Sequence, residues 1–485
     1  IVAVLRRRCS TACIHKLFNS ADDAVNDVVS GAKILTGGFG LCGMPQTLFK
    51  ALAAKNVKDL TIIGTSCGLN NYGPERLIKN NQVKRVVTTY VVGNQEVIRR
   101  YFAGSLELEM IPTGTLAERI RAAGAGVPAF YCPVGSSTLV EEGGWPVKYN
   151  DKGEVTEITD RKEKRIFNGV PYLLEEALFG DVAFVKAWMA DTDGNLVFRK
   201  TARNLNPDVC KAAKLCIVEA EKIVQAGELD PNDVHVPGLF VHRIVQSQEK
   251  TPIEKVIYQN DEVSNPAAEL RHRIARRAVL EFRDHMNGAF CLNSHFCNGS
   301  YPVPGEEDPD LINAAKESIT VKPGAAYFST VDSFAMIRSG KIDLAIMGAM
   351  EVSQFGDLAS WFIPSQMIKG MGAAFDFASA SRSVGGHTRL VVCMEHLAKG
   401  GKQKIVGNCQ LPLTGRRVVD MIITEKCVFR VDPEDGLLLT EIAEGVSIEE
   451  IISATALCRC EPSPLHIGVL DITAVRDMSI VFSYL

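Results

Sequence analysis

The chain has 485 residues, of which 46% are hydrophobic and 23% are charged, and its formal net charge is -4 at pH 7. This length is sufficient for two ordinary α/β domains, each with its own core. The charge balance provides no basic field for nucleic acid, and no apolar run reaches the roughly 18 to 20 residues that span a bilayer. We therefore expect neither nucleic acid nor a membrane as a partner.

The 14 cysteines are scattered through apolar segments. They form neither a CxxC pair nor a Cys/His cluster at metal-ligand spacing. Reduced and mostly buried thiols are favoured over zinc sites or disulfides, so we expect no metal.

The first segment, residues 1–20, is rich in Arg and contains Ser and Lys, and no acidic residue precedes Asp22. This composition is typical of an amphipathic transit peptide for an organelle. A secretory signal would have a longer, uninterrupted apolar centre. A solvated basic arm is the alternative interpretation.

Helical and apolar strand patterns alternate along the following hundred residues. The sequence predicts helices at 22–30, 46–55, around Leu77, at 95–103 and from Leu116, and strands at 32–36, 60–64, 85–91 and 106–111. Strands that are apolar throughout predict a mostly parallel sheet with both faces covered. Loops at the carboxyl ends of such strands line a crevice.

The most informative turn lies within residues 34–45, Ile-Leu-Thr-Gly-Gly-Phe-Gly-Leu-Cys-Gly-Met-Pro. A short strand ends in Gly37, Gly38, Phe39 and Gly40 and then leads into a helix. Exposed N–H groups in such a turn can bind an acyl oxygen or a phosphate, although glycines before a helix also serve tight packing without a ligand. The spacing matches neither a GxGxxG dinucleotide fingerprint nor a Walker loop.

The rest of the chain suggests a second α/β unit. A polar insert at 141–164 predicts a surface hairpin, and residues 183–190 resume a buried strand. Residues 245–267 lose the apolar period, which indicates a linker between a domain at 21–244 and another at 268–485. In the second unit we expect a helix at 268–286 and strands at 318–321, 344–347, 390–394 and 417–424. Two halves of similar size suggest a duplicated fold with the active site between them.

Several segments resemble the succinyl-CoA:3-oxoacid CoA-transferase family. The segments that carry the resemblance are 34–45, 114–131, 185–188 and 197–204 in the first half, and 310–314, 333–338, 347–350, 394–396 and 411–415 in the second. They occur in the family's order and cover nearly all of the chain after about Ser20.

The resemblance implies two fused CoA-transferase domains of one α/β fold with mostly parallel sheets, working as a homodimer in the mitochondrial matrix. It implies transfer of coenzyme A from succinyl-CoA to a 3-oxo acid such as acetoacetate, a step of ketone-body catabolism. The CoA thioester is then a substrate, and no cofactor is bound permanently.

The resemblance also implies a chemistry. The family's nucleophile is a glutamate that attacks the thioester and then holds CoA as a glutamyl thioester. Backbone N–H groups stabilise the oxyanion of each tetrahedral step. The candidate positions for these donors are Gly37, Gly38, Phe39 and Gly40 in the first half and Gly370, Met371, Gly372 and Ala373 in the second.

This chain departs from the family at the nucleophile. The family's glutamate lies in a Ser-Glu-Asn-Gly motif, which occurs nowhere here. Residues 287–300 are shorter than the family segment, so we expect the second domain to lack a buried parallel strand, its glycine-rich turn and a helix. Cys297 aligns weakly with the glutamate, and a loop thiol without a role is the alternative. Glu306 and Glu307 match an acidic surface segment instead.

Other positions also differ from the family. Thr65-Ser66 replaces an Asn-Asn pair, Thr113 replaces a Gln, and Ala373 replaces a glycine. Together these changes favour a catalytically impaired CoA-binding or dimer-partner pseudoenzyme as the alternative function. A skipped exon would explain the short segment alone, and the tail after Ala456 also stops resembling the family. A sugar-phosphate isomerase on the same kind of fold is disfavoured by the matched segments.

Four cationic or titratable residues fall within matched segments, namely Lys200, Arg203, Lys316 and His396. They would either contact CoA phosphates or form structural ion pairs. We assign none of them to catalysis, and no carboxylate takes the role of the family's glutamate.

Overall fold

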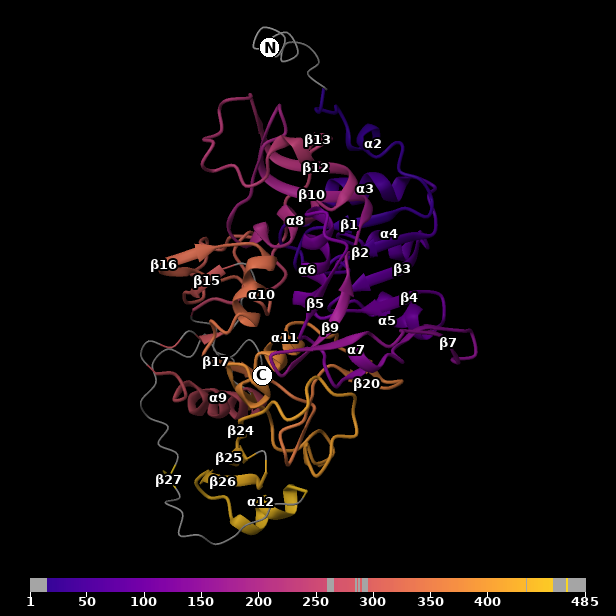
Figure 1. Ribbon diagram of the computed structural model, residues 1–485. Helices are drawn as coiled ribbons and strands as arrows, with labels where there is room; N and C mark the ends of the chain where they lie inside the picture. The colour runs from indigo at the N-terminus through magenta and orange to yellow at the C-terminus, as the bar shows by residue number, and fades with distance from the viewer. Residues whose placement is uncertain are drawn as a thin grey trace.

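The computed structural model describes residues 15–259, 266–283, 286, 288–289, 295–432, 434–456 and 468–469. Two α/β halves each contain their own large sheet (Figure 1). The α/β fold class expected from the sequence is confirmed.

The first sheet has the strand order β13–β12–β10–β1–β2–β3–β4, and β11 pairs with β10. Its strands are β1 (Lys33–Thr36), β2 (Leu60–Ile63), β3 (Val83–Thr88), β4 (Glu107–Met110), β10 (Gly180–Asp191), β11 (Leu196–Val197), β12 (Ala213–Val224) and β13 (Arg243–Gln246). Every pair is parallel except β10–β11. The mostly parallel sheet predicted for this half is therefore present.

Helices cover both faces of the first sheet. They are α2 (Ala21–Ala24), α3 (Gln46–Ala54), α4 (Glu75–Lys79), α5 (Gln95–Phe102), α6 (Thr113–Gly124), α7 (Leu139–Glu142) and α8 (Asn206–Val209), with 3₁₀ turns η1 (Lys200–Arg203) and η2 (Gly238–Phe240). Because side chains alternate along a strand, Ile34 packs in one core with Leu48 of α3, and Leu35 packs in the other with Leu116 of α6.

The insert predicted as a surface hairpin is the antiparallel pair β6 (Pro146–Tyr149) and β7 (Val155–Ile158). A neighbouring antiparallel sheet contains β5 (Ala129–Cys132), β8 (Lys164–Phe167) and β9 (Val170–Glu176). Trp145, just before β6, is buried and lies against Trp361 of the second half, with ring centroids 5.0 Å apart. The base of the hairpin, at Trp145, therefore packs in the interface between the two halves.

The second sheet has the strand order β14–β17–β22–β24–β25–β26–β27. Its strands are β14 (Gly288–Ala289), β17 (Leu344–Met347), β22 (Arg389–Cys393), β24 (Met421–Ile423), β25 (Cys427–Asp432), β26 (Gly436–Ile442) and β27 (Gly468–Val469). The pairs from β14 to β24 are parallel, and β24–β25 and β25–β26 are antiparallel.

Small sheets and helices complete this half. They are β15 (His295–Asn298), β16 (Val321–Tyr327), β18 (Glu351–Ser353), β19 (Leu358–Ala359), β20 (Phe362–Ile363), β21 (Met367–Ile368), β23 (Ile405–Val406), α9 (Pro266–Val279), α10 (Thr330–Arg338), α11 (Ala374–Ser379), α12 (Ile448–Ala454) and η3 (Arg382–Val384). Ile274 of α9 packs on one face of the sheet, and Phe334 of α10 and Phe377 of α11 lie in the core on the other.

The two large sheets differ in several pairings, one of which lies beside strands β10 and β22. In the first half, β10 has β12 on one side and β1, the strand that leads into the glycine turn, on the other. In the second half, β22 has β24 on one side and β17 directly on the other. Among the described strands, the neighbouring position that β1 occupies in the first sheet is thus occupied by β17.

The halves are packed against each other through several elements. Arg338 on α10 pairs with Glu118 on α6 at 3.2 Å, and the Gly114 N–H donates to Asp376 Oδ2 at 3.1 Å. The Thr113 N–H also donates to the Gly372 carbonyl at 3.0 Å. The loops of one half are therefore fixed relative to those of the other.

Some predicted boundaries differ from the structure. Leu17 pairs with Ile244 of β13, and Lys16 Nζ donates to two backbone carbonyls, so residues 16–18 of the expected transit segment pack on the first half. The first sheet extends to Gln246, two residues past the expected domain boundary. Helix α9 ends at Val279 instead of 286, and Leu280, which the expected helix would have included, is 51% exposed.

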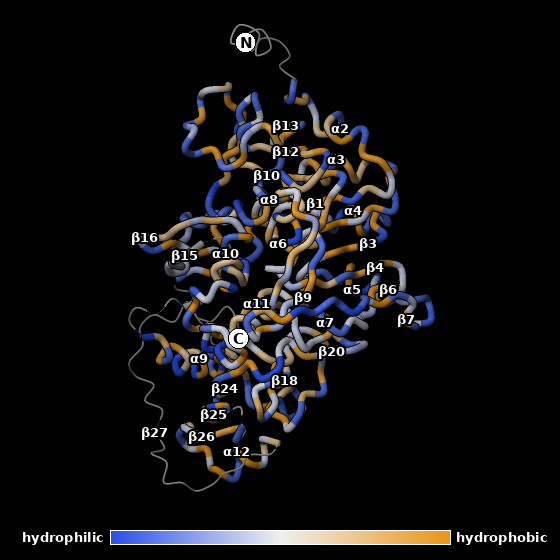
Figure 2. The backbone as a smooth tube through the Cα atoms, in the orientation of Figure 1, coloured by the Kyte–Doolittle hydropathy of each residue, from blue (hydrophilic) through white to orange (hydrophobic). Residues whose placement is uncertain are grey.

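None of the helices in the described part of the chain combines the length and the hydrophobicity needed to cross a bilayer. Figure 2 shows hydrophobic and hydrophilic segments alternating at short intervals along both halves. Within the same ranges, no three His, Cys, Asp or Glu side chains gather closely enough to hold a metal ion.

Candidate active site

A cavity of about 750 Å³ lies where loops of the two halves meet, and we call it the interdomain cavity. Phe39, Thr89 and Tyr90 line it from the first half, and residues 369–374 line it from the second. The first-half residues follow β1 and β3, so the cavity lies at the carboxyl ends of parallel strands. This is the position that the sheet topology favours for a ligand.

The first glycine turn is ordered by side chains from elsewhere in its own half. Gly38 has φ +102°, and its N–H donates to Asn204 Oδ1 at 3.0 Å. Thr65 Oγ donates to the Gly38 carbonyl at 2.7 Å. Thr65 stands where the family has Asn, and its single hydroxyl still holds the glycine turn by a hydrogen bond.

Most N–H groups of this turn are already engaged. Gly37 donates to the Phe184 carbonyl at 3.2 Å, and Phe39 donates to the Cys42 carbonyl at 2.9 Å. Within the described part of the chain, the Gly40 N–H has no protein acceptor. Of the four predicted positions, Gly40 is thus the one whose N–H remains available to a ligand.

The second predicted cluster forms the opposite wall of the interdomain cavity. Gly370 and Gly372 have φ of +112° and +51°, and a Cβ on Gly370 would lie 2.5 Å from the Thr89 carbonyl oxygen. The Gly372 N–H donates to that carbonyl at 3.0 Å. Among the described residues, the N–H groups of Met371 and Ala373 have no protein acceptor. The structure therefore brings Phe39 of the first predicted cluster and all four residues of the second to one cavity.

A glutamate that the sequence did not single out forms part of the wall. Glu254 lies in the expected linker, and its carboxylate Oε1 is 3.2 Å from Lys316 Nζ. A Cβ on Gly40 would lie 2.6 Å from Glu254 Oε2, so the carboxylate packs directly on the glycine turn. No local pattern around residue 254 gave a signal for it.

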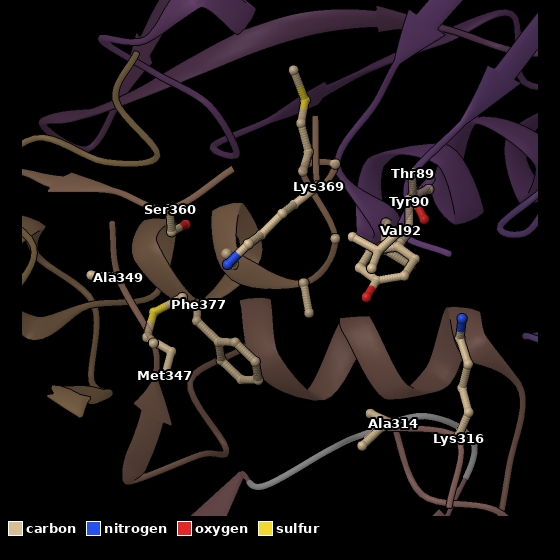
Figure 3. Close-up of a pocket in the computed structure, with 18 of the residues that line it drawn as sticks. Thr89, Tyr90, Val92, Ala314, Lys316, Met347, Ala349, Ser360, Lys369 and Phe377 are labelled. Carbon is tan, nitrogen blue, oxygen red and sulfur yellow. The ribbon is translucent and has the colours of Figure 1, made fainter. Parts of the chain in front are cut away.

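Lys316 is one of the matched cations, and it faces the interdomain cavity. Its Nζ lies 4.8 Å from the centre of the Tyr90 ring, a cation–π distance. Figure 3 labels both side chains in the cavity wall. Burial raises the pKa of Tyr90, and the charge of Glu254 adds to the effect. Tyr90 is therefore a neutral hydrogen-bonding group at neutral pH.

Two more lysines line the second-half side. Lys369 extends across the cavity from its loop (Figure 3), and burial lowers the pKa of its amine. Burial lowers the pKa of Lys404 to about 8, and Glu395 opposes that shift. With a pKa of about 8, Lys404 is mostly charged at neutral pH, and a partly desolvated ammonium group in the cavity suits an anionic ligand.

The other residues singled out lie elsewhere. Lys200 pairs with Asp308 at 2.7 Å, and Arg203 donates to the Tyr327 carbonyl at 3.0 Å. His396 is buried between Thr424 and Thr455. Each of these three makes structural contacts.

The loop acids and the cysteine have separate positions. The Glu307 carboxylate accepts hydrogen bonds from the Gly305 N–H and the Tyr258 hydroxyl, and Glu306 donates its N–H to the Val303 carbonyl. Cys297 lies on β15, which pairs with β16, and its side chain is outside the described residues, as are residues 290–294 of the shortened segment.

Comparison with known proteins also divides the chain into two regions, which correspond to the two halves of the structure. The coenzyme A transferase family profile matches residues 18–247 and 289–454. Succinyl-CoA:3-ketoacid coenzyme A transferase 2A, mitochondrial, of Mus musculus is 44% identical over 466 residues, covering 91% of this chain and 88% of the relative. The human succinyl-CoA:3-ketoacid coenzyme A transferase 2, mitochondrial, is 44% identical over 473 residues, covering 93% and 90%.

A solved structure shares the fold over the whole length. The apoenzyme of the acyl-CoA transferase YdiF from Escherichia coli O157:H7 superposes with a TM-score of 0.74 over 97% of this chain and 98% of that chain, at 20% identity. The family profile and the relatives both extend across the two halves that form the interdomain cavity. The chain belongs to the coenzyme A transferase family.

Proposed function

We propose that the protein transfers coenzyme A from succinyl-CoA to a 3-oxo acid such as acetoacetate. The observation that carries this proposal is the convergence of the two glycine loops on one cavity, in a chain whose relatives with this named activity align with about nine-tenths of it. The CoA thioester is a substrate here, and no permanently bound cofactor is required.

The charges of the interdomain cavity support an acid substrate. Succinyl-CoA and acetoacetate each carry a carboxylate, and CoA carries phosphates. Lys316, Lys369 and Lys404 all line the cavity, so the free carboxylate of either acid would find an ammonium partner there. The N–H groups of Gly40, Met371 and Ala373 are the donors that we assign to the thioester and its oxyanions.

We also propose that the protein works in the mitochondrial matrix, because the relatives are named as mitochondrial and residues 6–8 are basic. The homodimer is proposed from the family resemblance alone. Import of a fluorescent fusion into isolated mitochondria, compared with a fusion lacking residues 1–15, tests the location. Sedimentation equilibrium of the purified protein tests the assembly.

A second candidate function is a CoA-binding or dimer-partner pseudoenzyme. The observation that favours it is the absence of Ser-Glu-Asn-Gly, together with the direct pairing of β17 and β22. The two candidates predict different products from one assay. Purified protein is incubated with succinyl-CoA and acetoacetate, and acetoacetyl-CoA is measured by chromatography.

Formation of acetoacetyl-CoA in proportion to protein supports the transferase. Retained binding of acetoacetyl-CoA by calorimetry, with no exchange, supports the pseudoenzyme. Sequencing the transcript across residues 286–301 is a separate check, because an additional exon encoding Ser-Glu-Asn-Gly would attribute the short segment to splicing.

A further inference from the structure

Glu254 is held in place by the backbone that surrounds it. Lys255 forms a parallel bridge with Glu317, and its carbonyl accepts the Ser318 N–H at 3.0 Å. These contacts fix the linker beside Lys316, and the Glu254 side chain becomes part of the cavity wall with 12% of its surface exposed. This carboxylate is therefore positioned by the fold.

The two oxygens of this carboxylate are not equivalent. Oε1 lies 3.2 Å from Lys316 Nζ, whereas Oε2 is buried and accepts no hydrogen bond from the described residues. A buried carboxylate oxygen without a donor is costly, so stability alone does not account for it. Such an oxygen at the edge of a cavity has a free lone pair for an incoming group.

The glycine turn adds the other parts of a reactive site. Glu254 Oε2 lies 2.6 Å from the position that a Cβ of residue 40 would take, so the carboxylate and the turn are in direct contact. The Gly40 N–H has no acceptor within the described part of the chain. An unpartnered carboxylate oxygen and an ammonium group thus lie in the cavity wall, and the Gly40 residue with its available N–H packs beside them.

We propose that Glu254 is the carboxylate that accepts the acyl group, and then coenzyme A, in this protein. The inference rests on the proposed function, because it supplies the nucleophile that the transfer of CoA between two acids requires. It assigns the role to a residue of the linker, outside the segment where the Ser-Glu-Asn-Gly motif is missing.

The first half of the reaction balances without a proton or an electron carrier. Glu254 Oε2 attacks the acyl carbon of succinyl-CoA, the C–S bond breaks, and the CoA thiolate leaves with the electron pair. The thiolate then attacks the Glu254 carbonyl carbon of the mixed anhydride, and succinate leaves as a carboxylate. Glu254 now holds CoA as a thioester.

The second half reverses these steps with the acceptor acid. Its carboxylate attacks the Glu254 thioester and expels the thiolate, which attacks the acceptor's acyl carbon and releases Glu254 as a carboxylate. Lys316 lies on the Oε1 side, so it offsets negative charge on the Glu254 oxygen in the two tetrahedral intermediates that form at the Glu254 carbonyl carbon, one in each half of the reaction. The net change is exchange of one thioester for another.

Glu395, the other glutamate lining the interdomain cavity, lacks this combination. Its side chain is 42% exposed and lies 3.9 Å from Arg271, on the second-half side. The Glu395 carboxylate is therefore solvated. Glu254 differs in having a buried oxygen that contacts the glycine turn.

The test traps the intermediate on the intact protein. Wild-type protein is incubated with acetoacetyl-CoA and treated with hydroxylamine, which converts a glutamyl thioester into a hydroxamate on the same side chain. Peptide mass spectrometry then locates the hydroxamate. Glu254→Gln is the test variant, and Glu249→Gln is its control, because Glu249 lies on the same segment in a surface pair with Lys50. Calorimetry with acetoacetyl-CoA and thermal melting verify that each variant folds and binds.

We expect the hydroxamate on Glu254 in the wild type and in Glu249→Gln, and its loss, with at least a 1,000-fold fall in CoA exchange, in Glu254→Gln. A hydroxamate or other CoA adduct on a different residue, or one retained in Glu254→Gln, would overturn this inference while leaving the proposed function in place. Binding of acetoacetyl-CoA by the wild type with neither adduct nor exchange would overturn both. If Glu254→Gln does not fold, the wild-type peptide map decides.

Discussion

Asp376 Oδ2 accepts a hydrogen bond from the Gly114 N–H at 3.1 Å, and this contact joins the buried start of α11 to the start of α6. Burial raises the pKa of Asp376 from 3.8 to about 7, and Arg338, 3.9 Å from Oδ1, opposes the shift. The contact between the halves therefore contains a group that titrates near neutral pH.

The direction of the pH effect follows from the raised pKa. Between pH 4 and pH 7 the unfolded chain has lost this proton and the folded chain keeps it, so stability contributed by Asp376 falls as the pH rises, by about 1.4 kcal/mol per pH unit within that window. We expect Asp376→Asn, which retains an acceptor for Gly114, to remove this contribution. Urea unfolding from pH 5 to pH 8 measures it, and equal slopes in both proteins would contradict the assignment.

Trp145 connects the hairpin insert to the second half. Its ring packs on Trp361 and Phe362, and its Nε1 donates to the Leu108 carbonyl at 3.0 Å. We expect Trp145→Ala to destabilise the protein by about 3 to 5 kcal/mol, measured by urea unfolding. Ile158→Ala on the same hairpin is the control, because Ile158 is 56% exposed and its truncation should change stability by at most about 0.5 kcal/mol.

Substitution of Thr65 tests whether its hydroxyl holds the first glycine turn in place. Replacing it with Val removes the hydroxyl that donates to the Gly38 carbonyl and keeps the shape of the side chain. We expect a loss of about 1 to 2 kcal/mol of stability and weaker binding of acetoacetyl-CoA, followed by calorimetry. Thr61→Val, on the preceding strand β2, should leave binding unchanged, and equal effects of the two variants would contradict a role for the turn.

Lys404 should make ligand binding dependent on pH. The charged groups around it are Glu395, Lys369 and Glu425, and its lowered pKa of about 8 means that the ammonium form is lost as the pH rises from 7 to 9. We expect the Kd for acetoacetyl-CoA to rise over this range. Lys404→Met should weaken binding at pH 7 by on the order of tenfold and flatten the pH profile.

Lys399→Met is the control for that profile, because Lys399 is exposed on the loop before Lys404. It should keep the wild-type pH dependence. A Lys404→Met protein that still loses affinity between pH 7 and pH 9 would assign the titration to another group.

The strand, glycine turn and helix of residues 33–54 were predictable, because an apolar run, a glycine cluster and a helical period are all local signals. The strand at Leu344–Met347 matched the expected bounds for the same reason. The end of α9 did not, because the apolar residues Leu280 and Phe282 continue the helical period after the helix has ended.

Long-range contacts account for what the sequence did not reveal. Nothing near Glu254 distinguishes it from other surface acids, and only the folded chain brings it against Gly40. Phe18 likewise gave no signal, because its N–H finds the Ile244 carbonyl more than two hundred residues away. The first glycine cluster could be placed from its local strand, turn and helix pattern, and the second only from the family resemblance; both contain glycines with positive φ.

The linker between the halves contributes residues to the cavity wall, so it does more than keep the two halves close together. A tether normally raises the effective concentration of one module near another and adds no contact of its own. Here the tether brings a carboxylate and a backbone bridge to the place where the modules meet. Two separately expressed halves would therefore have to divide this stretch between them, and only the polypeptide that retains residue 254 would carry the reactive oxygen.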